Sequence, residues 1–103
     1  ALTRYEEVAD QQGVAKISNQ LGTLAQRRGD VEGALGYYAR SLMVNRDAGD
    51  KESVAAVLFN MGAAVHAQGD KKRARSYWAD ALVELGDGDS PLKKLLQRYL
   101  DQI

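Results

Sequence analysis

Few side chains in this sequence are of the types that catalyse reactions or bind metals. The chain has no cysteine and a single histidine, His66, whereas a metal site needs several converging ligands. Ser53 and Ser76 are the serines nearest to His66, and neither lies in the strained strand-to-helix turn of a nucleophilic serine. Gly29 and Gly69 stand alone, without the clustered glycines and following lysine of a phosphate-binding loop. We therefore predict no enzyme activity, no metal and no cofactor.

Two charged stretches have the composition of binding sites. A calcium loop would explain the glycines and aspartates of Gly86-Asp87-Gly88-Asp89. Such a loop ends with a glutamate that binds calcium through both oxygens, whereas this sequence continues into an apolar helix and lacks that glutamate. We interpret this stretch as a plain turn. The run Lys71-Lys72-Arg73-Ala74-Arg75 opens a helix, and we interpret it as a solvent-exposed face. A site for phosphate or for an acidic partner is the alternative.

Length and charge limit the possible functions further. With 103 residues the chain forms one small domain or a piece of a longer protein. Its 14 Lys+Arg balance 14 Asp+Glu, so no electrostatic attraction to nucleic acid or to an anionic membrane is expected. No apolar run reaches the ~18 residues of a membrane-spanning helix, and the first residues lack the pattern of a secretion signal. The absence of cysteine leaves the compartment open, and we predict a cytoplasmic protein.

The sequence repeats itself with an offset of 40 positions and without gaps. Gln20-Leu21-Gly22 recurs as Asn60-Met61-Gly62, Gly29-Asp30 as Gly69-Asp70, and Tyr37-Tyr38-Ala39 as Tyr77-Trp78-Ala79. Such a period indicates a stack of similar structural units.

Each unit reads as a helix, a tight turn and a second helix. Apolar residues follow helical spacing on both sides of the glycine-aspartate pair. The glycine ends the first helix, and the aspartate caps the second. A glycine inside a helix costs about 1 kcal/mol relative to alanine. Because Gly22 and Gly62 occupy equivalent positions, we expect them to let the helices approach closely, with Tyr38 and Trp78 filling the space between turns.

This order of small, aromatic and leucine residues resembles the tetratricopeptide repeat. The usual period of that family is about 34 residues, and the period of 40 is similar to its Leu-Gly-Asn variant. The resemblance covers residues 1 to about 85. It implies an all-α fold, namely a right-handed superhelix (α-solenoid) of antiparallel helix pairs with a C-terminal capping helix. It also implies a scaffold module that binds a peptide or protein partner.

We expect a single domain over residues 1–103. Residues 1–12 are predicted to be the second helix of a truncated repeat, because Ala1-Leu2 aligns with Ser41-Leu42, and the chain is interpreted as a fragment of a longer protein. Full repeats are predicted at 14–48 and 51–85. The last helix, 90–103, begins at Ser90-Pro91 and has one apolar face. It is expected to cover the last repeat; binding a partner chain is the alternative.

The resemblance places peptide contacts on the first helix of each pair, around the Leu-Gly pair. In the first repeat the corresponding residues are Lys16, Asn19, Gln20, Thr23, Gln26 and Arg27. In the second repeat they are Ala56, Phe59, Asn60, Ala63, His66 and Ala67. Asn60 stands where the family commonly has an asparagine that holds the peptide backbone, and Gln20 departs from it by one methylene. A cationic, amide-rich half and an apolar half together suit a peptide with one acidic and one apolar end.

Two other roles stay open at this point. The chain can be a structural segment that self-associates through its N-terminal or C-terminal helix and has no groove ligand. It can also be a non-catalytic part of a larger protein that positions a substrate or partner.

Overall fold

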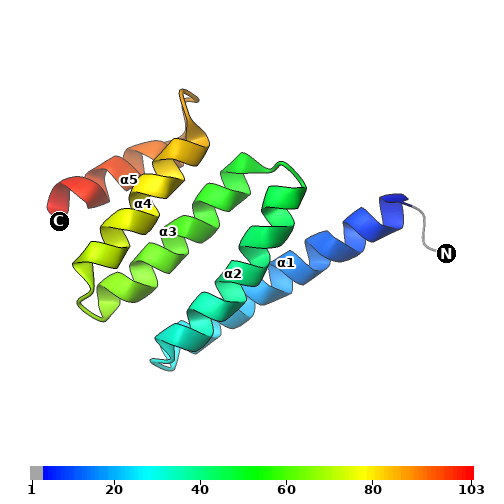
Figure 1. Cartoon of the computed structure of the whole chain (residues 1–103), viewed down its shortest axis with the longest axis horizontal. Helices are drawn as coiled ribbons and strands as arrows, with labels where there is room; N and C mark the ends of the chain where they lie inside the picture. The colour runs from blue at the N-terminus through cyan, green and yellow to red at the C-terminus, as the bar shows by residue number, and fades with distance from the viewer. Residues whose placement is uncertain (1–3) are drawn as a thin grey trace.

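The computed structural model describes the backbone of residues 4–103 and the side chains of residues 10–103. This part of the chain forms five α-helices and no strand: α1 (Arg4–Arg27), α2 (Val31–Asp47), α3 (Lys51–Ala67), α4 (Lys71–Leu85) and α5 (Pro91–Gln102). The helices stand side by side in chain order, and α1 and α5 lie at opposite ends of the row (Figure 1). The predicted all-α helical repeat fold is thereby confirmed.

The turns before α2, α3 and α4 share one design. In each, a glycine with a positive φ of 83°, 72° or 85° ends the preceding helix, a conformation that residues with a Cβ rarely adopt. The next residue is an aspartate whose carboxylate accepts a hydrogen bond from the backbone N–H three residues later. These pairs are Gly29-Asp30, Gly49-Asp50 and Gly69-Asp70. The chain therefore reverses direction every 20 residues along this stretch.

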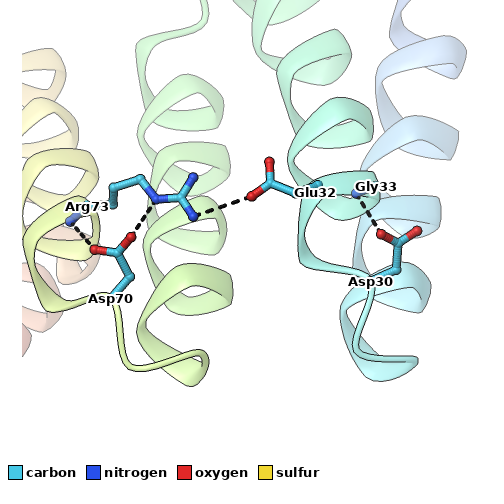
Figure 2. A network of polar contacts seen from close by, with 5 residues as sticks. All are labelled: Asp30, Glu32, Gly33, Asp70 and Arg73. Atoms are coloured by element: carbon cyan, nitrogen blue, oxygen red, sulfur yellow. Dashed lines mark hydrogen bonds and ion pairs between the residues drawn. The ribbon is translucent and has the colours of Figure 1, made fainter.

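An ion-pair network connects two of these turns (Figure 2). Asp70 accepts hydrogen bonds from the Arg73 backbone N–H at 3.0 Å and from its Nε at 2.7 Å. The backbone bond and then the side-chain bond lower the pKa of Asp70. Arg73 also reaches across to Glu32 of α2 at 3.4 Å. One cation of the basic run therefore joins α4 to α2, while Lys71, Lys72 and Arg75 are exposed.

Two glycines inside helices allow aromatic rings to contact the backbone directly. A Cβ on Gly22 would lie 2.6 Å from the ring of Tyr38, and a Cβ on Gly62 would lie 2.5 Å from Cδ1 of Trp78. Both distances are shorter than a van der Waals contact, so a side chain at either position would overlap the ring. Both aromatic side chains are almost fully buried. The prediction that these glycines lie at helix crossings and accommodate Tyr38 and Trp78 is confirmed.

The beginning of α1 differs from the expectation that residues 1–12 form a helix of their own. Residues 1–3 lie outside the described residues, and residues 4–12 continue directly into the first helix of the 14–48 repeat. The reason is local. Forty positions before Gly49 the chain has Ala9, and alanine resists the left-handed conformation with which Gly49 ends α2. Asp10, the equivalent of the capping Asp50, consequently lies within a helix.

Helix α5 packs against α4 and begins at a well-defined cap. The Ser90 hydroxyl accepts a hydrogen bond from the Leu92 N–H at 3.2 Å and donates one to Glu52 of α3 at 2.9 Å. Pro91 follows at the first helical position. Leu96 is completely buried. Further apolar side chains of α5 contact the core, namely Leu92, Tyr99, Leu100 and Ile103. The apolar face of α5 therefore extends the core beyond the second repeat.

Replacing the capping Asp50 with alanine should lower the free energy of unfolding by about 1 kcal/mol at pH 7. The Ser53 hydroxyl and backbone N–H donate to its carboxylate at 2.7 and 3.1 Å, and these bonds lower the pKa of Asp50. A lowered folded-state pKa stabilises the fold above the unfolded pKa of about 4, and this contribution disappears as pH falls through the folded value. The difference between wild type and Asp50→Ala should therefore be constant from about pH 5 to pH 8 and shrink at lower pH.

Urea unfolding at neutral pH and near pH 3 measures this difference. Asp80→Ala is the control, because Asp80 is an exposed carboxylate inside α4 and its loss should change stability by less than about 0.5 kcal/mol. An Asp50→Ala effect that is equally large at acidic pH would show that the ionised cap does not cause it.

Candidate functional site

A polar groove lies between α1 and α3, with α2 as its floor. It encloses about 220 Å³. Its lining, which defines the polar groove below, consists of Gln12, Ala15, Lys16 and Asn19 from α1, Ser41 and Asn45 from α2, and Ser53, Ala56, Val57 and Asn60 from α3. Seven of these ten side chains carry amide, hydroxyl or ammonium groups. The groove is therefore suited to hydrogen bonding.

Two carboxamides join the walls of the polar groove. Asn60 Nδ2 donates to Asn19 Oδ1 across a distance of 3.3 Å, which is long for a hydrogen bond and makes it weak. Both side chains are partly exposed. Each carboxamide has two donor hydrogens and an acceptor oxygen with two lone pairs, so this contact leaves further hydrogen-bonding capacity. The two carboxamides therefore retain donors and acceptors for further hydrogen bonds.

The floor of the polar groove is made of buried polar residues of α2. Ser41 and Asn45 are both buried, and Asn45 Nδ2 donates to the Ser41 carbonyl oxygen at 3.0 Å. The carboxamide is thereby fixed in place one turn from the serine. Among the described residues, every deeply buried side-chain nitrogen or oxygen has a hydrogen-bond partner. The floor is thus a satisfied polar surface that positions the groove without strain.

The residues predicted for peptide binding fall into separate groups. Lys16, Asn19, Ala56 and Asn60 line the polar groove. Thr23 and Gln26 contact the Tyr38 hydroxyl, at 3.1 Å and 3.0 Å. Gln20 and Arg27 are exposed and lie outside the polar groove.

The remaining predicted residues, Phe59, Ala63, His66 and Ala67, lie on α3 next to an aromatic cluster. The Tyr99 ring from α5 lies 5.2 Å from the rings of Phe59 and of Trp78, measured between ring centroids. The His66 ring lies 5.5 Å from that of Trp78. The indole Nε1 of Trp78 donates to the Phe59 carbonyl oxygen at 3.1 Å. Helix α5 therefore covers Phe59, which the sequence suggested as an open apolar contact.

An aromatic pocket of about 570 Å³ remains beside this cluster. Its lining comes from α3, α4 and α5 and consists of Ala63, His66, Ala67, Lys71, Trp78, Tyr99, Gln102 and Ile103. The structure thus divides the expected groove into a polar part between α1 and α3 and an aromatic part at α5.

Sequence reasoning missed the four other polar residues of the polar groove, namely Gln12, Ser41, Asn45 and Ser53. The family resemblance assigns contacts to first helices only, whereas Ser41 and Asn45 belong to a second helix. A usable signal was present. Both polar residues continue the buried stripe of α2 that includes Leu35 and Tyr38, and a polar residue in a buried stripe indicates either a hydrogen-bond network or a site.

Two other kinds of site, a metal centre and a membrane-spanning helix, are absent from the described residues. Within the described side chains, no three histidine, aspartate or glutamate residues converge as metal ligands would. Of the helices between residues 4 and 103, none combines the length and apolar character needed to cross a membrane.

Comparison with known protein families gives a match over most of the chain. The matching family model is described as tetratricopeptide repeat and covers residues 13–82. Searches of curated proteins and of solved structures found no significant match. The matched region extends from within α1 to within α4, so it includes both glycine–aromatic contacts and the polar groove apart from Gln12.

Proposed function

The chain belongs to the tetratricopeptide repeat family, whose repeats generally mediate protein–protein interactions, and from this we propose that its polar groove binds an extended segment of a protein partner. The family is typically a non-enzymatic interaction module. The proposed role is accordingly recognition and not catalysis.

The observation that carries the proposal is the arrangement of hydrogen-bonding groups on three helices around one groove. An extended peptide has unpaired backbone N–H and C=O groups on both sides, and carboxamides can donate to one and accept from the other. Asn19 and Asn60 present such groups from opposite walls. A groove of about 220 Å³ admits a short extended stretch, whereas a helix is about 10 Å wide.

The charge in the groove specifies the peptide further. Among the residues whose side chains the structure describes, Lys16 is the only charged one that lines the groove, and it is exposed, so an acidic side chain or a terminal carboxylate is the fitting partner. We place an apolar residue of the same peptide at the aromatic pocket, where Ala63 and His66 line the continuation of α3. The proposed ligand is therefore a peptide with an acidic group near one end and an apolar group near the other.

Peptides selected from a phage-displayed random library should test this proposal. We expect enriched sequences to hold an acidic residue. Fluorescence polarisation of labelled peptides should show about 10-fold weaker binding for Lys16→Ala, since a hydrogen bond to a charged group contributes about 1.5–3 kcal/mol. Asn60→Ala should weaken binding about as much, since it removes two neutral hydrogen bonds to the peptide backbone of about 0.5–1.5 kcal/mol each. The double variant should bind at least about 100-fold more weakly.

Gln20→Ala is the matched control, because Gln20 is an exposed amide of α1 outside the polar groove. It should bind as wild type does. Circular dichroism confirms that each variant is folded. Enriched peptides without acidic residues, or unchanged affinity of the double variant, would show that the partner binds elsewhere.

A further inference from the structure

The outer side of α1 carries an apolar stripe that the described part of the chain leaves uncovered. Its members are Val14, Ile17, Leu21 and Leu24, with exposed fractions of 41%, 58%, 39% and 44%. They follow one another at intervals of three, four and three residues, so they form one line along the helix. We call these four residues the α1 stripe. Large apolar side chains gathered in this way mark an interaction surface.

The internal repeat shows which kind of surface the α1 stripe resembles. Forty positions later the equivalent residues of α3 are Val54, Val57, Met61 and Ala64, all with exposed fractions of 6% or less. Helix α3 packs against two helices. Its Gly62 faces α4, and another side of α3 packs against α2. Val57 meets Ser41 and Asn45 of α2 in the polar groove. The face of α3 that is equivalent to the α1 stripe is therefore buried by α2, the antiparallel second helix of the preceding repeat.

The α1 stripe has the symmetry of a surface that can pair with itself. Its spacing reads the same in both chain directions, so an antiparallel copy sets Val14 opposite Leu24 and Ile17 opposite Leu21. The same alignment sets Asp10 opposite Arg28 of the other copy at both ends. These two residues continue the line of the stripe by four positions on each side, and both are exposed. Apolar residues thus meet apolar residues, and opposite charges meet at the rim.

We propose that two copies of this chain associate through their α1 stripes as an antiparallel, two-fold symmetric dimer. A two-fold interface uses the same surface on both copies and closes, so it forms a dimer and no filament. Within residues 4–103, α1 lies at one end of the row of helices (Figure 1), and its neighbours α2 and α3 leave the α1 stripe exposed. Lys16 and Asn19 lie in the polar groove on another side of α1, so each protomer keeps its groove. The dimer does not depend on the proposed peptide binding.

The size of the contact determines how tight the dimer is. The α1 stripe spans about 15 Å of helix, and four apolar side chains per copy bury less than the roughly 800 Å² per partner of a standard interface. We therefore expect a dissociation constant of about 10–100 µM. Sedimentation velocity from about 1 µM to about 500 µM should show monomer changing to dimer across this range.

Ile17→Glu should weaken the dimer by at least about 100-fold, since it places two charges in the centre of the apolar contact. Ile17 is exposed in the protomer, so the fold should be retained, which circular dichroism checks. Val83→Glu is the matched control. Val83 is an apolar residue of α4 that is 80% exposed, and its replacement should leave the dissociation constant unchanged.

A charge exchange tests the antiparallel arrangement. Asp10→Arg alone should weaken the dimer about 10-fold, because two like-charge pairs replace two opposite ones. Adding Arg28→Asp should restore the dissociation constant to within about 3-fold of wild type. The proposal is overturned by a chain that stays monomeric at the highest concentration, in which case the stripe is a face for another helix. A dimer that Ile17→Glu leaves intact, or one that the second charge change does not rescue, overturns it as well.

Discussion

Gly62→Ala is expected to lower the free energy of unfolding by about 2–3 kcal/mol, although alanine favours a helix over glycine by about 1 kcal/mol. The new methyl group would lie only 2.5 Å from Cδ1 of Trp78. The indole cannot easily move, because it is almost fully buried and its Nε1 donates to the Phe59 carbonyl oxygen. Urea unfolding followed by tryptophan fluorescence measures the change, since Trp78 is the only tryptophan of the chain.

Gly36→Ala is the control for this substitution. Gly36 lies inside α2, and a Cβ built on it meets no atom within 4 Å. Its replacement should therefore raise the stability by about 0.5–1 kcal/mol through helix propensity alone. If both alanine variants gained stability, close contact between Gly62 and the indole would not govern the packing of α3 against α4.

The largest loss of stability is expected from Trp78→Ala, at about 3–5 kcal/mol. The indole is the common neighbour of Phe59 and His66 on α3 and of Tyr99 on α5. Its removal leaves a cavity where three helices meet, and it also leaves the docking of α5 without its main aromatic contact on α4. Since the variant has no tryptophan, circular dichroism in urea is the measurement. A loss below about 1 kcal/mol would show that the cluster contributes little.

The two substitutions should not be additive. In the Trp78→Ala background the alanine at position 62 meets no indole, so its clash disappears and its better helix propensity remains. The double variant should then be at least as stable as Trp78→Ala alone, a coupling of more than about 2 kcal/mol. Additive losses would place the cause of the Gly62→Ala effect elsewhere than in the contact with Trp78.

Much of the fold follows from residues that recur 40 positions apart. The glycine–aromatic pairs and the glycine–aspartate turns are local features, and each has a direct physical cause in backbone conformation or side-chain volume. The continuity of α1 depended on a single departure from the repeat, Ala9 in place of glycine. An alignment that scores all positions equally gives this departure little weight, although it decides whether a helix ends.

The candidate site was less accessible to sequence reasoning. Lys16, Asn19 and Asn60 share one groove because they occupy the first helices of neighbouring repeats, which the period implies. The placement of Tyr99 against Phe59 could not be predicted in this way, because α5 has no equivalent elsewhere in the chain. Ser41 and Asn45 were missed because they lie on a second helix, α2, and line the groove between the first helices α1 and α3.

Because α1 continues without a turn at position 9, residues 4–13 do not fold back over Val14. A reversal at position 9 would bring the preceding residues back over Val14 and Ile17 and convert them into an inner seam, as happens at α3. With Ala9 the backbone runs straight on (Figure 1). Among the described residues, the one methyl group of Ala9 thus decides whether Val14 and Ile17 are buried between two helices or stay exposed on α1, where another helix can pack against them.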